Sequence, residues 1–492
     1  MNNTATLQEF SDSLVEHRPT HVDAAFLQSV IACLRADNVK NAGAIAAGHS
    51  VLVTRLSVLP DLNFAALEQL EPPVRELLLT YLVHNILMEE VFEKILVRLR
   101  RTLLFNVLAG DDVGPFGLDV LSALGVFAFG KEYVFAETAG EREALAKLNL
   151  YNGPLHVAAI ACYRPLYRLH QPVWLLSTEM PSTYFAKMLQ VQLTEPLEEL
   201  RLRVEIESLA PITDATSVAV QQMYEENPYP RWTNRPVARG KLAGNYSDVL
   251  VAGCGSGQHP IFEALYRPAS KVVGLDLSMA SLGYASRKSC EYGLTNLKFV
   301  HGDILDVKAL GRSFDFISSA GVLHHMADPL KGLQALASVL AENGRMEIAL
   351  YSEAGRRVIV QAIAMREQLN IPGTSDGIRA LREHILALPV SAPARGITEF
   401  ADFYSMSGCR DLIFHVQEHR LDLTSVDRLV RDAGLVLKKF LVTPAQQKQF
   451  QAQIPDGDPH SLLDWAKFEA MNPAAFASMY RLALVKPSGG RR

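Results

Sequence analysis

The 492-residue sequence contains little cysteine, and its cysteines follow no pairing pattern. There is no Cys-x-x-Cys spacing, and the five residues are scattered: Cys33, Cys162, Cys254, Cys290 and Cys409. Such a distribution indicates free thiols in a reducing compartment rather than a disulfide framework. We therefore expect a cytoplasmic protein.

The sequence also lacks a marked excess of either charge. It has 48 lysines and arginines against 53 aspartates and glutamates, which gives a net charge of −5. Nucleic-acid binding usually leaves a basic excess on a domain or a run of basic residues. We expect no nucleic-acid partner, and we expect the short basic groups at residues 98–101 and 356–357 on solvated helix faces.

No apolar run is long enough to suggest a membrane span. The longest one, Leu77 to Met88, contains His84 and Asn85 and is followed by two glutamates, so it is too short and too polar to cross a bilayer. We interpret it as a buried core helix. Residues 1–10 lack a charged segment followed by an apolar one, and no secretory signal is expected.

A chain of this length predicts two or three domains. From about Phe10 to Ala210 the pattern is helical, and apolar residues recur every three or four positions from Leu77 to Leu103. We expect one long helix there, begun by the prolines at 72 and 73. Helical hairpins are expected after it, at residues 118–135 with 141–151 and at 156–169 with 183–193. The interpretation is a helical domain over residues 1–215.

The most informative stretch is an apolar strand that runs into a glycine-rich turn at residues 249–258. Gly253, Gly255 and Gly257 are spaced at i, i+2 and i+4, whereas a dinucleotide fingerprint has its third glycine at i+5. Asp276 ends the next strand, 23 positions after Gly253, where a carboxylate can accept both ribose hydroxyls of an adenosine ligand. These features favour an adenosine ligand other than NAD.

Two further strand ends continue the pattern. Asp303 follows a short apolar run and is suited to accept from an adenine amino group. Residues 314–329 read as a strand that opens into a loop containing His324 and His325 before the next helix.

With these four motifs in order, residues 248–352 resemble the class I S-adenosylmethionine-dependent methyltransferases. The resemblance implies an α/β fold, with a seven-strand sheet and helices on both faces, and S-adenosylmethionine as cofactor, released as S-adenosylhomocysteine. It implies that these residues contact the cofactor: Gly253, Cys254, Gly255, Gly257, Asp276, Leu277, Asp303, Ile304, Ala320 and His325. More broadly, the chain is similar to bacterial methyltransferases in which tetratricopeptide-like or helical repeats precede the catalytic domain.

The segment Asn-Pro-Tyr-Pro-Arg-Trp at residues 227–232 stands between the helical region and the sheet. Its two prolines force an extended backbone. Residues 216–245 are interpreted either as an interdomain linker or as a flap over the methionine end of the cofactor, with Tyr224 or Arg231 contacting the carboxylate.

The methyltransferase domain is expected over residues 246–492, with insertions at about 353–424 and 444–478 that interrupt the minimal fold. Insertions of this length are usually functional. The first is expected to be helical, and in it Asp402, Tyr404 and Arg410 either position an acceptor or tie the insertion to the sheet.

Methyl transfer needs donor and acceptor to be held in line, and it needs a base only where the acceptor must lose a proton. His324 is a candidate base, whereas His325 either contacts cofactor or substrate or caps its loop. His415 and His419 share an expected helix face with Glu418 beside them, which resembles a metal motif. No third ligand is evident, so we expect no metal. The predicted catalytic residues are His324, His325, Tyr404 and Arg410.

The sequence thus predicts an enzyme that methylates a protein or peptide side chain, because helical repeats often offer extended binding surfaces. Two alternatives stay open. One is a small-molecule or natural-product methyltransferase, in which the extra helices close a pocket or form a homodimer interface, and the other is a non-catalytic scaffold that binds the nucleoside.

Overall fold

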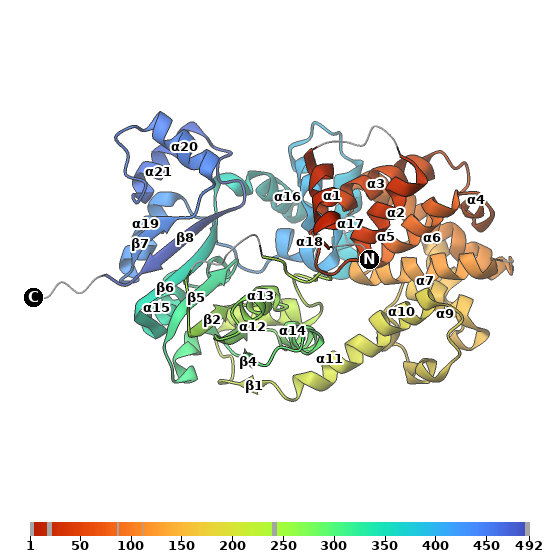
Figure 1. The fold of residues 1–492 in the computed structure, drawn as a ribbon, viewed down its shortest axis with the longest axis horizontal. Helices are drawn as coiled ribbons and strands as arrows, with labels where there is room; N and C mark the ends of the chain where they lie inside the picture. The colour runs from red at the N-terminus through yellow and green to blue at the C-terminus, as the bar shows by residue number, and fades with distance from the viewer. Residues whose placement is uncertain (1–3, 17–21, 86–87, 112, 239–243, 488–492) are drawn as a thin grey trace, which may run out of the picture. The chain divides into compact units, whose positions relative to one another are not determined.

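The structure, a computed structural model, describes residues 4–16, 22–85, 88–111, 113–238 and 244–487. The chain divides into two compact units (Figure 1). The first contains Met1–Glu198, Arg231–Val237 and Leu369–Arg410, and the second contains Glu199–Pro230, Ala238–Gln368 and Asp411–Arg492. Of the predicted linker at 216–245, residues 239–243 lie outside the described residues, as do Ile86 and Leu87 of the predicted core helix.

The first unit is helical. Its helices are α1 (Thr4–Glu16), α2 (Ala24–Arg35), α3 (Ala42–Ser57), α4 (Phe64–Glu68), α5 (Pro72–His84), α6 (Glu90–Ala109), α7 (Gly114–Gly130), α8 (Ala139–Leu145), α9 (Pro154–Ala161), α10 (Thr183–Leu189) and α17 (Ser375–Ala387). Short turns of helix occupy Leu150–Asn152, Leu166–Arg168, Pro172–Ser177, Gln190–Thr194, Pro393–Glu399 and Ala401–Tyr404. The unit boundaries at residues 198 and 410 fall inside α11 (Glu195–Arg203) and α18 (Met406–Ile413).

The prediction of a single long helix from residue 77 to residue 103 is wrong. The chain leaves α5 at Asn85, which is extended, and starts α6 after Glu89, whose side chain accepts from the backbone N–H groups of Val91 and Phe92. An N-cap that satisfies the free amides of a first turn begins a new helix even where the apolar period continues. The hairpin helices predicted after it exist but are shorter than expected.

The second unit is an α/β fold, as predicted. Its strands are β1 (Glu207–Ser208), β2 (Asp248–Ala252), β3 (Lys271–Asp276), β4 (Leu297–His301), β5 (Phe314–Ala320), β6 (Leu340–Tyr351), β7 (Val436–Phe440) and β8 (Met479–Val485). Its helices are α12 (Ala215–Glu225), α13 (Gln258–Tyr266), α14 (Met279–Glu291), α15 (Pro329–Val339), α16 (Arg357–Gln368), α19 (Leu423–Asp432), α20 (Pro444–Gln453) and α21 (Leu462–Met471), with short turns at Ile304–Leu310, Leu323–His325 and Ala354–Arg356.

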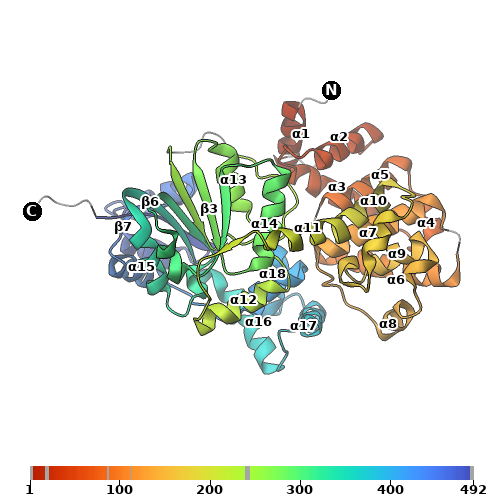
Figure 2. The ribbon, with the colours of Figure 1, turned by 90° about the horizontal axis from the view of Figure 1, so that it is seen from below.

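These strands form one mixed sheet in the order β1-β4-β3-β2-β5-β6-β8-β7, with β8 antiparallel to both neighbours (Figures 1 and 2). The described residues therefore form eight strands rather than seven. The extra one, β1, is two exposed residues that pair with the end of β4. Strand β1 could not be predicted from the sequence, because its two residues are too few to show an alternation of apolar and polar positions.

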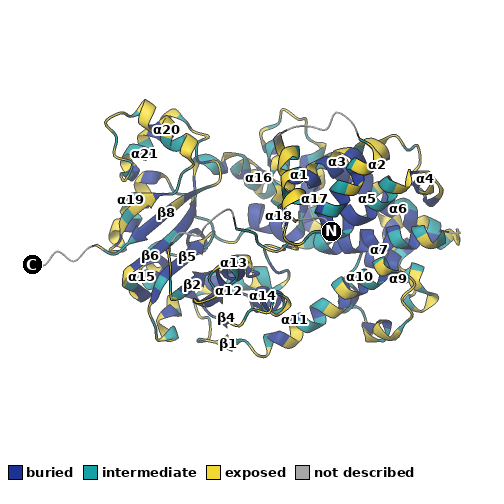
Figure 3. Cartoon of the chain, in the orientation of Figure 1, coloured by how far each residue is buried: buried dark blue, intermediate teal, exposed yellow. Residues whose placement is uncertain are grey.

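The strands of the sheet centre are apolar because helices cover both faces of a parallel sheet. Residues 249–252 and 272–275 are buried throughout. Helices α13 and α14 pack beside β2, β3 and β4, while α15 packs beside α19 (Figure 1). Figure 3 shows the buried strands and the exposed faces of outer helices such as α20.

The order of strands leaves a topological switch point between β2 and β5. The chain moves outward from β2 to β3 and β4 and then returns to the other side of β2 to form β5. In open α/β sheets ligands bind outside the carboxyl ends of the strands at such a point. The loops after β2 and β5 are therefore the place to look for a site.

Residues 369–410 belong to the first unit because buried charges hold them there. The guanidinium of Arg382 on α17 pairs with both carboxylate oxygens of Glu93 on α6, at 3.1 and 2.6 Å. It also donates to the carbonyls of Phe403, at 2.7 Å, and Val134, at 3.1 Å. Arg382 is 2% exposed and Glu93 is 6% exposed, so both ions depend on each other.

The basic groups at residues 98–101 and 356–357 were predicted to lie on solvated helix faces. In each group one arginine is buried, so the prediction is wrong for that residue. Arg100 is 1% exposed and lies 3.3 Å from the buried carboxylate of Glu141. Arg356 is 3% exposed and pairs with Glu418. Long basic side chains enter a protein interior when a carboxylate is already there to meet them.

We expect Arg382→Met to lower the free energy of unfolding by about 3–5 kcal/mol, because it leaves Glu93 charged, buried and unpaired. Differential scanning calorimetry measures the loss. The double variant Glu93→Met with Arg382→Met should recover much of it, since no charge is then stranded. A single variant as stable as the unsubstituted chain would show that the pair does not hold this segment.

Candidate active site

A cavity of ≈ 340 Å³ lies at the switch point of the sheet in the second unit. It is bounded by the loop after β2, the carboxyl ends of β3 and β5, the turn after β4, and residues from α12 to Pro230. Of the predicted residues, these line it: Tyr224, Gly253, Cys254, Gly255, Asp276, Leu277, Asp303, Ile304, Ala320 and His325. The structure thus brings most of the predicted cofactor set together, although their roles stay predictions.

The loop after β2 is built from glycines in the left-handed region. Gly253 has φ +71° and Gly255 has φ +52°. A Cβ on Gly255 would stand 2.6 Å from the carbonyl oxygen of Tyr229, so both the backbone conformation and the space require glycine there. Gly257 does not line the cavity, because it begins α13, where a Cβ would meet Ala285 at 2.5 Å.

Asp276 fixes the loop to the end of β3. Its carboxylate accepts from the backbone N–H of Gly255 at 2.7 Å and from that of Ser278 at 2.9 Å. Burial raises the pKa of Asp276, and the two N–H groups oppose that rise. Since a carboxylate offers about four acceptor positions, Asp276 keeps acceptor capacity for ligand hydroxyls after both backbone bonds are made.

Asp303 lies at the next strand end and is 4% exposed. One of its oxygens accepts from the backbone N–H of Leu305 at 2.9 Å, which caps the short helix at Ile304–Leu310. The carboxylate is therefore held rigidly at the cavity wall.

The segment before the sheet closes one side of the cavity. The backbone N–H of Ser256 donates to the carbonyl of Tyr229 at 3.1 Å, and the Ser256 hydroxyl donates to that of Pro230. Tyr224 donates its hydroxyl to the carboxylate of Asp411, and the Tyr224 and Tyr229 rings stack at 5.9 Å. Arg231 is elsewhere, since it belongs to the first unit, where it lies 3.9 Å from Glu132 and over the ring of Phe129.

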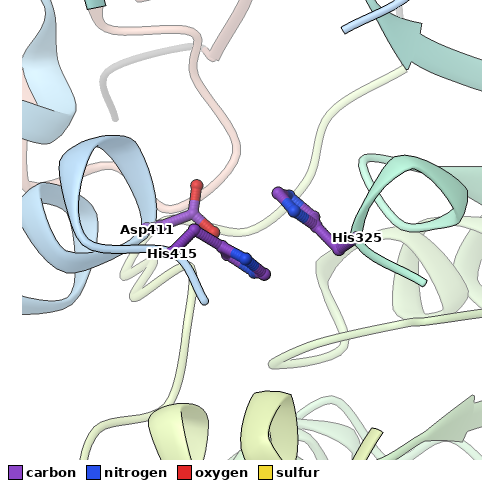
Figure 4. Close-up of side chains that lie close together, drawn as sticks. All are labelled: His325, Asp411 and His415. Carbon is purple, nitrogen blue, oxygen red and sulfur yellow. The ribbon is translucent and has the colours of Figure 1, made fainter. Parts of the chain in front are cut away.

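His325 reaches the cavity and is 5% exposed. Its Nδ1 lies 2.8 Å from the carbonyl of Gln417, and its ring stacks on His415 at 3.5 Å (Figure 4). Burial lowers the pKa of His325, although the Asp411 carboxylate opposes the change. His325 thus lines the cavity and bonds to a segment far along the chain, while its contact with cofactor or substrate stays a prediction.

His324 is fully buried and does not line the cavity. Its Nδ1 accepts from the backbone N–H of Tyr351 at 3.3 Å, and its ring lies 3.9 Å from that of Tyr351. Burial holds the pKa of His324 well below its ordinary value, with the positive charge of neighbouring groups adding to the effect. The ring of His324 is thus enclosed by protein, and its catalytic role stays a prediction.

Tyr404 and Arg410 belong to the first unit and do not line the cavity, and Asp402 shares that unit. The Tyr404 hydroxyl donates to the carbonyl of Thr398 at 2.9 Å, and Arg410 is buried.

The predicted shared helix face of His415 and His419 is wrong, because α18 ends at Ile413 and both histidines follow it in irregular chain. His419 Nε2 bonds instead to the carbonyls of Met326 and Ala327, at 3.1 and 3.3 Å, and Glu418 is occupied by Arg356. A different trio, His325, Asp411 and His415, has potential ligand atoms within 4.8 Å of one another.

That trio is a poor metal site for a specific reason. The backbone N–H of Gln417 donates to His415 Nδ1 at 3.1 Å, so the neutral ring carries its hydrogen on Nε2. A metal needs a lone pair at the nitrogen that it binds. The trio is better suited to proton chemistry.

Several cavity residues were not given a role from sequence: Ser217, Val220, Tyr229, Gln258, His259, Ser281, Tyr351, Asp411 and Met479. Asp411 is the most consequential, because it is the carboxylate nearest the histidines. Nothing in its local sequence marks it, since it enters the site from the far end of a long insertion.

Sheet order, glycine loop and cavity together define an α/β protein whose cavity lies where open α/β sheets bind their ligands. Residues 246–377 match the family model described as a methyltransferase domain. This part of the chain is a methyltransferase domain, and the resemblance to S-adenosylmethionine-dependent methyltransferases is confirmed for it.

The chain is similar to an uncharacterized protein of Synechococcus, with 29% identity over 259 residues, 47% of this chain and 61% of that protein. It is also similar to the tRNA U34 carboxymethyltransferase of Alteromonas mediterranea, with 34% identity over 106 residues, 20% of this chain and 31% of the relative. Among solved structures, PKMT2 from Rickettsia typhi in complex with AdoHcy has a TM-score of 0.40 at 15% identity, covering 56% of this chain and 54% of that one. The chain thus spans less than two thirds of the length of these relatives.

No helix in the described part of the chain has the length and apolar character needed to cross a membrane.

The buried histidines predict loss of stability in acid. Burial lowers the pKa of His324 and His325, and that of His415 to about 2. Below pH ~6.5 these histidines bind protons in the unfolded chain but stay neutral in the folded one. The free energy of unfolding therefore falls as pH falls, by up to about 1.4 kcal/mol per pH unit for each ring.

Thermal denaturation between pH 7 and 5 checks this. His415→Gln should flatten the acid slope, whereas His460→Gln, at an exposed histidine on the carbonyl of Lys438, should leave it unchanged. An equal slope in all three proteins would contradict the prediction.

Proposed function

We propose that this protein is an enzyme that transfers a methyl group from S-adenosylmethionine to an acceptor in the cavity of the second unit. The observation that carries the proposal is the convergence of the glycine loop, Asp276 and Asp303 at the switch point within a methyltransferase domain. When bound, S-adenosylmethionine supplies an electrophilic methyl group and leaves as S-adenosylhomocysteine.

In this proposal Asp276 accepts from the ribose hydroxyls, while Asp303 and Ile304 contact the adenine. Gly253, Cys254 and Gly255 let the ligand approach the backbone, and Leu277, Ala320 and Tyr224 complete the wall. Transfer is an in-line displacement, so the residues accelerate it mainly by alignment. The proposal includes these site residues. It also includes the division of the chain into a helical domain at 1–215, a linker or cofactor flap at 216–245 and a methyltransferase domain at 246–492.

For the acceptor we propose a protein or peptide side chain. The residues that line the cavity all belong to the second unit, and helical surfaces such as that of the first unit commonly dock extended chains. One relative's name refers to tRNA, but the net charge of −5 offers no attraction for a polyanion. A small-molecule acceptor, with the helices forming a closed pocket or a homodimer, is the second candidate.

We also propose a cytoplasmic location. All five cysteines are free, with Cys290 exposed and the others buried, as expected where thiols stay reduced.

We expect Asp276→Ala to weaken S-adenosylhomocysteine binding by about 1–3 kcal/mol, measured by isothermal titration calorimetry, because charge-assisted hydrogen bonds are lost. The matched control is Asp315→Ala. Asp315 also accepts from two backbone N–H groups, those of Ser247 and Asp248 at 3.0 and 3.1 Å, but it lies at the opposite end of β2 and outside the cavity. Equal affinity in both variants would refute the ribose assignment.

Transfer of isotopically labelled methyl into a size-fractionated extract of the source cells tests the acceptor. We expect label in a protease-sensitive macromolecular fraction, and none with Asp276→Ala. Label only among small molecules would establish the second candidate. Cofactor binding without any labelled product would indicate a non-catalytic scaffold.

A further inference from the structure

The least explained polar atom of the cavity is Nε2 of His325. It is buried and makes no hydrogen bond among the described residues, as is true of Nε2 of His324 and His415, but of these three rings only that of His325 lines the cavity. An unsatisfied buried polar atom is costly unless it serves a ligand or a reaction. The question is whether this nitrogen presents a hydrogen or a lone pair.

The backbone of Gln417 determines which nitrogen of His325 carries the hydrogen. A carbonyl oxygen only accepts, so the 2.8 Å contact between that of Gln417 and His325 Nδ1 requires a hydrogen on Nδ1. In the neutral ring Nε2 then carries a lone pair. The same residue's N–H only donates, and it donates to Nδ1 of His415 at 3.1 Å. The backbone of one residue, Gln417, therefore places the hydrogen on Nδ1 of His325 and on Nε2 of His415, although the two rings stack on each other.

The charged groups around His325 suit a proton acceptor. Asp411 is the nearest carboxylate, and Glu418 adds negative charge, whereas Arg356 opposes protonation. The neighbouring rings are His324, Tyr351 and His415. Tyr224 donates to Asp411 and so orients that carboxylate. A neutral ring next to a fixed carboxylate can take up a proton that the carboxylate then stabilises.

We infer that His325 is the base of the reaction, that Nε2 accepts the proton which the methyl acceptor loses, and that the acceptor atom therefore carries a proton, as a hydroxyl oxygen or an ammonium nitrogen does. This inference rests on the proposed function. As the bond from the acceptor atom to the methyl carbon forms, the bond from sulfur to that carbon breaks and its electron pair stays on sulfur. A hydroxyl loses its proton to His325 as that bond forms, whereas an ammonium loses it beforehand, because its nitrogen has no free electron pair until then. Asp411 stabilises the imidazolium.

This assignment distinguishes acceptors that must lose a proton from acceptors that have none to lose. A carboxylate or a thioether has no proton to lose and would gain nothing from the base. A hydroxyl and an ammonium share the need for it. The labelled product distinguishes them, because methyl esters release methanol in mild alkali, whereas methyl ethers and methylamines resist it and are told apart by mass spectrometry.

The test uses the full chain with His325→Gln, and His460→Gln as the matched control at an exposed histidine. The probe is the extract fraction that the unsubstituted protein labels. We expect His325→Gln to transfer methyl at least about 100-fold more slowly and to lose the acid limb of the pH–rate profile, while it still binds S-adenosylhomocysteine. Full activity in His325→Gln, or alkali-labile label, would overturn the inference.

Nitrogen NMR of the histidine rings in the unsubstituted protein gives a second measurement that does not depend on how the variant folds. We expect hydrogen on Nδ1 of His325 and on Nε2 of His415 at pH 7. A hydrogen on Nε2 of His325 would overturn the inference. No labelling by the unsubstituted protein would overturn the proposed function itself, which separates the two failures.

Discussion

The hydrogen bond from Gly255 N–H to Asp276 is the contact on which the cavity depends. It ties the loop after β2 to the end of β3, and the N–H groups of Gly253 and Cys254 reinforce the tie by donating to the carbonyl of Leu275, at 2.8 and 3.0 Å. A glycine backbone has more freedom to lose on folding than any other. These bonds hold it in one shape and leave the Asp276 carboxylate at the cavity wall.

What the sequence predicted well was this part of the molecule, because there the chemistry is local. A glycine triplet after an apolar run and an acid after the next strand follow each other within 30 residues, and the spacing alone limits what they bind. Asp276, Asp303 and Ala320 all stand at the edge of one sheet because parallel strands end at the same edge. Pattern and topology therefore give the same result.

The rest of the site could not be predicted because its residues meet only through tertiary packing. Asp411 and His415 are far from His325 in sequence, and a helical period suggested the wrong partner, His419, for His415. The same difficulty affects the helical unit, where Arg382 looks like one more surface arginine until Glu93 is found beside it. Neither carboxylate is marked by its own neighbours in the chain.

Gln417 shows how backbone groups can set the chemistry of side chains. Its carbonyl and its N–H belong to one short segment and bond to two different imidazoles. That segment is anchored by the buried pair of Arg356 with Glu418, and by His419, whose N–H donates to the carbonyl of His324 at 2.7 Å. Because a backbone carbonyl or amide cannot change its role with pH, the tautomers that it selects persist across the range in which side chains titrate. The residues around Gln417 therefore act on the site by keeping that segment in place.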